Sequence, residues 1–334
     1  MTDSEAGRVP LTGHLEQRTS FGPIRIISVF PLPAVARAEV ARRFVMEETD
    51  PASLGTHSPQ AEPNVLLLGP PLRVDKAFLA RLPVSIGAIA TYSVGLDHVD
   101  VEAIRARCLA LFNTPGVLSN AVADHAMLLI LAATRRMSEA TALLREGRWK
   151  DMRSNQILGI ELVDRTLGIY GLGDIGRRVA RRAAAFGIRV VYHSRRRASD
   201  EAGARFAATA DELLAKADIL LLAAPSTDET RNFLDRRRLA MARNGVVVVN
   251  IARGDLVDDE ALLEALANGK VRAAALDVFR KEPHVDPRYL ALPNVVATPH
   301  VASATEEARR NMAATLCDAI EAWQRGERPA NQVV

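Results

Sequence analysis

Short apolar segments alternate with amphipathic ones along the chain before residue 113. The pattern predicts strands at 24–30, 65–69, 86–94 and 109–113, and helices near 34–46, from residue 75 and near 100–107. Strands and helices in alternation predict a small α/β unit. The segment 119–147 is long and apolar on one side, so we expect one helix there that connects two domains.

A second alternating series starts at Thr166. Its predicted strands cover residues 166–171, 188–193, 218–224, 245–251 and 272–278. Because these strands are short and continuously apolar, they are typical of a parallel sheet that helices cover on both faces. The last apolar segment, 304–325, has helical spacing, and we expect it to pack back on the first unit. The fold class predicted is α/β, with two Rossmann-like domains built on parallel sheets.

Length and composition agree with two domains. The chain has 334 residues, of which 48% are hydrophobic and 25% charged, enough for two separate cores. We expect residues 1–22 to be a disordered tail. One discontinuous domain is predicted at 23–113 and 304–334, and the other at 114–303. With neither a secretory signal nor an apolar run long enough for a bilayer, the sequence favours a cytoplasmic protein.

Charge and cysteine content argue against several classes of function. The net charge is +3, but arginines are interleaved with acids and aromatic residues are few, so neither a nucleic-acid-binding surface nor a membrane partner is predicted. Cys108 and Cys317 have no ligand or disulfide spacing. We therefore expect two buried thiols and no metal site.

A glycine-rich segment, GLGDIG, follows the predicted strand 166–171 and opens a helix within one βαβ unit of ~30 residues. Gly171 would permit a tight turn, Gly173 would let the backbone approach a pyrophosphate, and Gly176 would let the helix lie close to the sheet. The segment therefore predicts a dinucleotide site, made of Gly171, Leu172, Gly173, Asp174, Ile175 and Gly176.

The end of the next strand indicates which dinucleotide is bound. An acid at this place would bind the ribose hydroxyls of NAD and repel a 2′-phosphate. Here Ser194 is followed by Arg195 and Arg196, and an arginine binds a phosphate with a planar fork of donors. The sequence therefore favours NADPH over NADH.

Three more places at the carboxyl ends of predicted strands carry polar residues. In a parallel sheet these ends lie at one edge, where ligands bind. Arg253 comes directly after a buried strand. Asp277 lies at the end of the next strand with Glu282 beyond it, and His300 lies in a loop before the last helix. Reduction of a ketone by hydride needs a proton donor, and a histidine beside a carboxylate suits that task. An arginine would clamp a substrate carboxylate.

The order of motifs resembles the D-2-hydroxyacid dehydrogenase family from about residue 24 onward. The resemblance rests on SVGLDHVD, NTPGVLSNAVADHAMLLIL, GLGDIG, NIARGDLVDDEALLEAL, LDVFRKEP and TPHVAS. The segments YHSRR, ATYSVGLDHVD and LLAAPST are most similar to the glyoxylate/hydroxypyruvate reductase branch, which uses NADPH. The resemblance implies that Arg253, Glu282 and His300 are the catalytic residues, with Glu282 paired to His300.

The resemblance also implies the remaining contacts. Cofactor and substrate would lie in a cleft between the domains, with the amides of Val94 and Gly95 on the substrate carboxylate and Asp277 on the nicotinamide carboxamide. The other implied cofactor contacts are Ala224, Pro225, Thr230, Ile251, Ala252, Arg253, His300 and Ala302. The subunits would form a homodimer, and Trp149 would reach the neighbouring subunit's pocket. Where the family usually has Gly then Ser after the histidine, this chain has Ala302 then Ser303.

We therefore interpret the sequence as that of an NADPH-dependent reductase of a small 2-ketoacid such as glyoxylate or hydroxypyruvate. A hydroxyphenylpyruvate reductase and a 2-ketogluconate reductase are the nearest alternatives. A corepressor-like protein that uses the same fold to sense nicotinamide is an alternative from another class.

Overall fold

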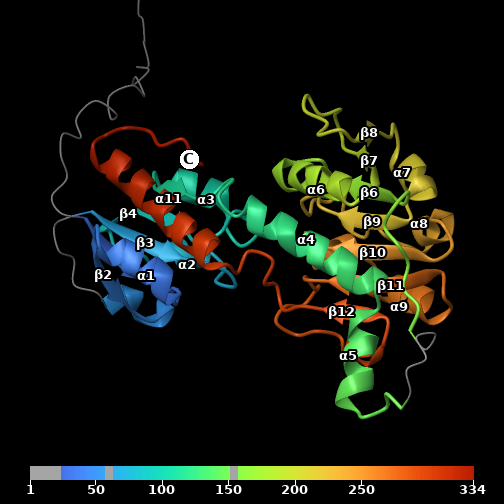
Figure 1. Cartoon of the computed structure of the whole chain (residues 1–334). Helices are drawn as coiled ribbons and strands as arrows, with labels where there is room; N and C mark the ends of the chain where they lie inside the picture. The colour runs from blue at the N-terminus through green and yellow to red at the C-terminus, as the bar shows by residue number, and fades with distance from the viewer. Residues whose placement is uncertain (1–23, 57–62, 151–156) are drawn as a thin grey trace, which may run out of the picture. The chain divides into compact units, whose positions relative to one another are not determined.

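The structure is a computed structural model, which describes residues 24–56, 63–150 and 157–334. Its contacts divide the chain into two compact units (Figure 1). The first comprises the described residues up to Val117 together with Glu306–Val334, and the second comprises Leu118–Thr305. The tail predicted at 1–22 lies outside the described residues.

The first unit contains a parallel sheet of five strands in the order β2-β1-β3-β4-β5. The strands are β1 (Arg25–Ser28), β2 (Val45–Glu48), β3 (Asn64–Leu68), β4 (Ile86–Thr91) and β5 (Ala110–Phe112). The helices are α1 (Ala34–Ala41), the 3-10 helix η1 (Pro51–Thr56), α2 (Lys76–Ala80), α3 (Val101–Ala106) and α11 (Glu306–Gln324). The C-terminal helix α11 packs against α1, and Arg43 fastens the two by hydrogen bonds to Glu321 and Asp318.

The second unit contains a parallel sheet of seven strands in the order β12-β11-β10-β9-β6-β7-β8. The strands are β6 (Thr166–Tyr170), β7 (Arg189–His193), β8 (Arg205–Phe206), β9 (Ile219–Leu222), β10 (Val246–Asn250), β11 (Val271–Leu276) and β12 (Val295–Ala297). The helices are α4 (Ser119–Thr134), α5 (Met137–Arg145), α6 (Asp174–Ala185), α7 (Ala210–Lys216), α8 (Arg236–Met241), the 3-10 helix η3 (Gly254–Leu256), α9 (Asp259–Ala267) and α10 (Pro287–Ala291).

Two hydrophobic layers enclose this seven-stranded sheet. On one face, α4 and α6 pack against each other and against the strands, burying residues such as Ile130 and Val179. On the other face lie α7, α8 and α9, with Leu214, Leu239 and Leu262 in the second layer. Both faces are apolar, which explains why the strand sequences are continuous apolar runs. The prediction of an α/β fold with two parallel sheets is confirmed.

The three strands that the sequence analysis did not predict all lie at sheet edges. They are β2 in the first sheet and β8 and β12 in the second. Each is short and partly exposed: β2 and β8 carry no continuous apolar run, and that of β12 is only three residues long. The predicted helix near 34–46 is too long, because it includes the start of β2. Helix α1 ends at Ala41, and β2 begins at Val45.

The single helix predicted over 119–147 is also wrong, because it is two helices. Between α4 and α5, Arg136 adopts a left-handed backbone conformation with φ of 53°. The carbonyl oxygen of Thr134 accepts the amide of Ile160 at 2.9 Å, where a continuous helix would use the amide of Ser138. The close crossing of the chain at Gly159, where a Cβ would lie 2.6 Å from that carbonyl, ends α4 here.

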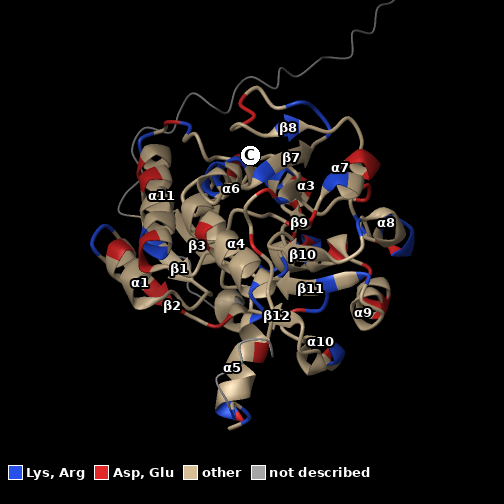
Figure 2. Cartoon of the chain, turned by 45° about the vertical axis from the view of Figure 1, so that its right-hand side comes forward, with Lys and Arg blue, Asp and Glu red and all other residues tan. Residues whose placement is uncertain are grey.

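The surface carries both charges along its helices. Figure 2 shows Lys and Arg beside Asp and Glu on α1, α7 and α11, and ion pairs such as that of Arg236 with Glu264 join neighbouring elements. Within the described residues, no helix is both long and apolar enough to cross a membrane. Cys317 is buried as expected, but Cys108 is exposed.

Candidate active site

The parallel sheet of the second unit brings the ends of six strands to one edge. Apart from Trp149, the predicted functional residues of this unit follow β6, β7, β9, β10, β11 and β12 at their carboxyl ends. The chain reverses its order between β6 and β9, and ligands of open α/β sheets bind at such a reversal. The topology therefore groups side chains that lie up to about 130 residues apart in sequence, from Gly171 to Ala302.

The three glycines of GLGDIG have the geometry that a dinucleotide turn needs. Gly171 has φ of 102°, and a Cβ there would lie 2.7 Å from the amide nitrogen of Ala224. At Gly176 a Cβ would lie 2.5 Å from the carbonyl oxygen of Gly171. Gly173 is the N-cap of α6 and has open space where its Cβ would be. The residues therefore fit a bound pyrophosphate at the helix N-terminus.

Ser194, at the end of β7, is tied to this turn. Its hydroxyl oxygen accepts the amide of Leu172 at 2.8 Å. Next to it, Arg195 and Arg196 are exposed, and neither forms a hydrogen bond or ion pair with another described residue. Arg197 differs, because its guanidinium binds Glu201 at 2.7 and 3.1 Å. Two of the three arginines are thus available to a ligand.

The other predicted cofactor contacts line the same edge. Ala224, Thr230, Ile251 and Ala302 are buried, Ala252 is half-buried, and Pro225 is exposed. The hydroxyl of Thr230 donates to the carbonyl of Pro225 at 2.7 Å, which fixes the turn after β9. Asp174 begins α6 and is held by Arg178, and Ile175 packs on the core. The structure places these residues at the expected edge, and their roles toward a cofactor stay predictions.

Arg253 is held by a loop that Asn250 shapes. Asn250 is buried at the end of β10, where its side-chain oxygen accepts the amide of Ala252 at 3.0 Å. Its side-chain nitrogen donates to the carbonyl of Arg253 at 2.8 Å. These two bonds set the backbone from which the Arg253 side chain starts. The sequence analysis did not single out Asn250, although its place as a polar residue ending a valine strand was a visible signal.

Glu282 and His300 are in direct contact. The Nδ1 atom of His300 lies 2.7 Å from Oε2 of Glu282, and the amide of Phe279 donates to Oε1 at 2.9 Å. Burial raises the pKa of Glu282, but the hydrogen bonds from His300 and Phe279 and the charge of Arg253 bring it below its usual value. The His300 side chain is 49% exposed and that of Glu282 34%. The pairing of these two residues is what the sequence analysis expected.

His300 has a left-handed backbone, which Asp277 enforces. Its φ is 53°, and its amide donates to the carbonyl of Asp277 at 2.8 Å. The carboxylate of Asp277 accepts the next two amides, Val301 at Oδ1 and Ala302 at Oδ2, both at 2.9 Å. A non-glycine residue in this region is strained by about 1–2 kcal/mol, and these three bonds offset that cost.

Asp277 is fully buried and has further partners. The hydroxyl of Thr298 donates to Oδ1 at 2.6 Å, and Nε2 of His125 lies 3.1 Å from the Thr298 oxygen and 3.5 Å from Oδ1. Burial raises the pKa of Asp277, and the hydrogen bonds from His125, Thr298 and the two amides lower it below its usual value. The contact with a nicotinamide carboxamide stays a prediction. What the structure shows is a buried carboxylate that shapes the His300 loop.

His125 and Thr298 are contributions that sequence reasoning missed. Both lie within the segments that carry the family resemblance, yet neither has a spacing that points to the other. They lie 173 residues apart in sequence and meet because α4 packs against β11 and β12. Only the packed structure pairs them.

Three more predicted residues belong to other parts of the chain than these strand ends. Val94 and Gly95 belong to the first unit, in the loop after β4, where Asn113 binds the Val94 carbonyl at 3.0 Å. Trp149 follows α5 and is 53% exposed. The parts of these residues in substrate binding stay predictions. In the described ranges, no group of three or more His, Cys, Asp or Glu side chains is placed to hold a metal ion.

Comparison with known proteins decides the family. Residues 127–302 match the model of the family described as D-isomer specific 2-hydroxyacid dehydrogenase, NAD binding domain. The chain belongs to this family. It is therefore an oxidoreductase with a nicotinamide-nucleotide-binding domain, and the resemblance found in the sequence is confirmed.

Relatives and solved structures agree with this assignment. The glyoxylate reductase of Pyrococcus furiosus is 40% identical over 268 residues, which cover 78% of this chain and 79% of that one. A putative D-isomer specific 2-hydroxyacid dehydrogenase from a Polaromonas species has a TM-score of 0.88 at 39% identity, covering 94% of this chain and 100% of that one. The NADPH-dependent glyoxylate/hydroxypyruvate reductase of Sinorhizobium meliloti, in complex with NADP and malonate, has a TM-score of 0.82 at 30% identity, covering 94% and 97%.

The first prediction concerns Asp277. Asp277→Asn replaces one acceptor oxygen by an amide group, so one of the amides of Val301 and Ala302 loses its partner. We expect the free energy of unfolding at pH 7 to fall by about 1.5–3 kcal/mol. Because the folded-state pKa of Asp277 is lowered, its stabilisation is complete above the unfolded value of about 3.9 and is lost as the pH falls through the folded value. Urea unfolding at pH 7 and at pH 3 measures both effects.

Asp228→Asn is the matched control, because the Asp228 side chain is 98% exposed. We expect little change in that variant at either pH. A difference between wild type and Asp277→Asn that is equally large at both pH values would contradict the assignment of the effect to the ionised carboxylate.

Proposed function

We propose that the protein reduces a small 2-ketoacid of the glyoxylate or hydroxypyruvate type to the D-2-hydroxyacid, with NADPH as the reductant. The observation that carries this proposal is the contact of His300 with Glu282 at 2.7 Å, on the same sheet edge as the glycine turn. The names of the relatives from Pyrococcus furiosus and Sinorhizobium meliloti support the choice of substrate.

The roles of the three residues follow from their chemistry. NADPH, when bound, supplies the hydride. His300 gives a proton to the oxygen of the ketone from Nε2, since its Nδ1 is engaged by Glu282. The carboxylate of Glu282 holds the imidazole at Nδ1 and stabilises positive charge on the ring. Arg253 binds the substrate carboxylate or carbonyl oxygen. Val94 and Gly95 belong to the first unit. That their backbone amides bind the substrate carboxylate is a prediction from the family resemblance.

The preference for NADPH rests on the end of β7. Ser194 stands where an NAD site has an acid, and Arg195 and Arg196 are exposed beside it. An arginine fork binds a 2′-phosphate with two charge-assisted hydrogen bonds. The S. meliloti relative, which is named as NADPH-dependent, supports the same preference.

One experiment distinguishes the proposed function from the alternative substrates and from a binding protein without activity. A panel of 2-ketoacids with each cofactor distinguishes glyoxylate and hydroxypyruvate from hydroxyphenylpyruvate and 2-ketogluconate. A nicotinamide-sensing binding protein would bind the cofactor and turn over none of the acids. We expect the highest kcat/KM with glyoxylate or hydroxypyruvate and NADPH.

The second prediction tests the cofactor. Replacing both Arg195 and Arg196 by Gln removes two charge-assisted contacts, each contributing about 1.5–3 kcal/mol. We therefore expect KM for NADPH to rise at least ~10-fold while KM for NADH changes little. Arg197→Gln is the matched control, because Arg197 is already paired with Glu201. A wild-type enzyme that prefers NADH would overturn the proposal.

The third prediction concerns Glu282. Glu282→Gln keeps the size of the side chain but removes the charge that favours the imidazolium of His300. In reduction, the high-pH limb of the kcat/KM profile should therefore move to lower pH. The profile is measured with saturating NADPH, with Glu260→Gln, an exposed carboxylate, as control. A limb that stays in place or moves upward would remove Glu282 from the catalytic set.

We also propose that the protein is a homodimer that pairs through the second unit. Helix α5 buries no side chain, and Met137, Leu144 and Trp149 are each more than half exposed. A pocket of about 1050 Å³ lies between α5 and residues 289–297. Exposed apolar side chains on and just after a helix that has no buried residue favour a protein contact there.

The fourth prediction tests the dimer. Sedimentation velocity should show twice the chain mass of 36.2 kDa, and Leu144→Asp should shift the population toward the monomer, because it places a charge in an apolar contact. A wild-type monomer at all concentrations would contradict the pairing.

A further inference from the structure

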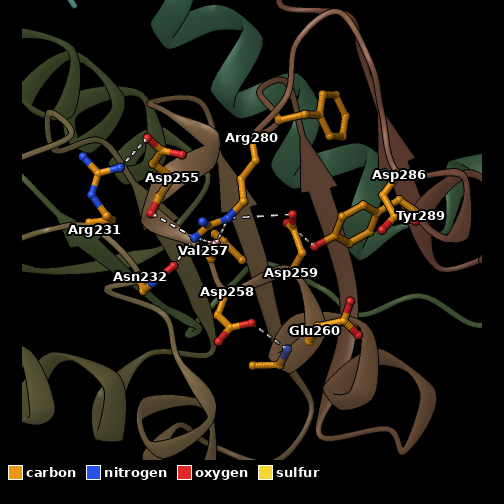
Figure 3. Close-up of polar contacts among 12 residues, drawn as sticks. Arg231, Asn232, Asp255, Val257, Asp258, Asp259, Glu260, Arg280, Asp286 and Tyr289 are labelled. Carbon is orange, nitrogen blue, oxygen red and sulfur yellow. Dashed lines mark hydrogen bonds and ion pairs between the residues drawn. The ribbon is translucent and has the colours of Figure 1, made fainter.

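Arg280 links two loops that carry the catalytic candidates. It lies between Asp277 and Glu282, in the loop after β11. Its Nε donates to the carbonyl of Val257 at 2.9 Å, and its Nη2 donates to the same oxygen at 2.5 Å. The guanidinium also binds the side-chain oxygen of Asn232 and lies 3.4 Å from the Asp255 carbonyl (Figure 3).

The carbonyls that Arg280 binds belong to the segment that follows Arg253. Asp255 and Val257 lie two and four residues after Arg253, in and just beyond η3. The amides of Leu256 and Val257 donate back to the carbonyls of Arg253 and Gly254. A rigid 3-10 turn therefore connects the atoms that Arg280 holds with the backbone of Arg253.

The two loops also touch through their backbones. A Cβ on Gly254 would lie 2.1 Å from the carbonyl carbon of Phe279 and 2.3 Å from the amide nitrogen of Arg280. Only glycine allows this approach. At the other end of the same loop, the amide of Phe279 donates to Oε1 of Glu282. The backbone of Phe279 thus contacts Gly254 on its carbonyl side and the Glu282 carboxylate through its amide, so it connects the Arg253 loop with Glu282.

An ion pair alone does not explain Arg280. Its nearest carboxylate, Asp259, lies 3.7 Å from Nε. Burial raises the pKa of Asp259 above its usual value, while a hydrogen bond from Tyr289 and the charge of Arg280 act in the opposite direction. The guanidinium of Arg280 instead donates to backbone carbonyl oxygens and to the side-chain oxygen of Asn232. These hydrogen bonds join two loops.

We infer that Arg280 is a positioning residue that fixes the Arg253 loop against the Glu282 loop, and thereby fixes the substrate clamp relative to the His300–Glu282 pair. This inference rests on the proposed function. Arg280 touches neither reacting group, so its loss would act on two properties together. Both substrate affinity, through Arg253, and the pH dependence, through Glu282, would change.

The experiment compares Arg280→Gln and Arg280→Lys with wild type. Gln removes the charge and the fork, and Lys keeps the charge but cannot span Val257 and Asn232 at once. Since a displacement of ~1 Å can cost ~10²-fold in rate, we expect kcat/KM for the ketoacid to fall at least ~10-fold in Arg280→Gln and less in Arg280→Lys. KM for the ketoacid should rise and the high-pH limb should move to lower pH in the same variant. The dissociation constant of NADPH should stay unchanged.

Arg288→Gln is the matched control. Arg288 also joins two elements by several bonds, to Glu260 of α9 and to Asp286, but it contacts neither catalytic loop. We expect it to lower the melting temperature at most, with KM and the pH profile unchanged. Variants of Arg280 that fold and change only the melting temperature, as this control does, would overturn the inference. If Arg280→Gln does not fold, the KM and pH profile of Arg280→Lys decide in the same way.

A readout without substrate separates this inference from the proposed function. Hydrogen exchange of the backbone amides in 251–258 and 277–283 should accelerate in both segments together in Arg280→Gln or Arg280→Lys, and in neither in Arg288→Gln. If the wild type reduces no ketoacid but the two segments loosen together, the proposed function fails and the coupling of the loops stands. If the wild type is active and the segments do not respond, the inference alone fails.

Discussion

The buried carboxylate of Asp277 is the interaction on which the arrangement around His300 depends. Its two oxygens accept the amides of Val301 and Ala302. Through these bonds it holds His300 in a left-handed conformation that an isolated histidine would avoid. The side chain of His300 is thereby held at Glu282 through Nδ1. Burying a charged carboxylate costs free energy, and the hydrogen bonds from Thr298 and the two amides compensate for that cost here.

The parallel sheet of the second unit brings the loops of Arg253, Asp277 and His300 together. Arg253, Asp277 and His300 follow β10, β11 and β12, which are adjacent in the sheet, so their loops meet at one edge. The glycine turn follows β6, two strands from β10 in the same sheet. A site for a nucleotide and a histidine–carboxylate pair are therefore built on one rigid layer whose two faces are buried. The nucleotide-binding domain of this family thus supplies one fixed scaffold for both.

The sequence predicted those parts of the fold and site that local signals specify. Continuous valine, isoleucine and leucine runs located the central strands, and the contexts of Gly171, Arg253 and His300 located the loops. Edge strands such as β8 and β12 carry too few apolar residues to be found in this way. The break at Arg136 depends on a crossing by Gly159, and the contact of His125 with Thr298 depends on how α4 packs on the sheet. Such features come from tertiary contacts, which no local pattern contains.

The central claim is that His300, held by Asp277 and Glu282, donates the proton in ketoacid reduction. The most direct measurement is kcat of His300→Ala with glyoxylate or hydroxypyruvate, together with the dissociation constant of NADPH from fluorescence titration. Because general acid catalysis contributes typically ~10²–10⁴-fold, kcat should fall within that range while NADPH binding is preserved. A variant that binds NADPH normally and retains a kcat close to that of the wild type would contradict the account.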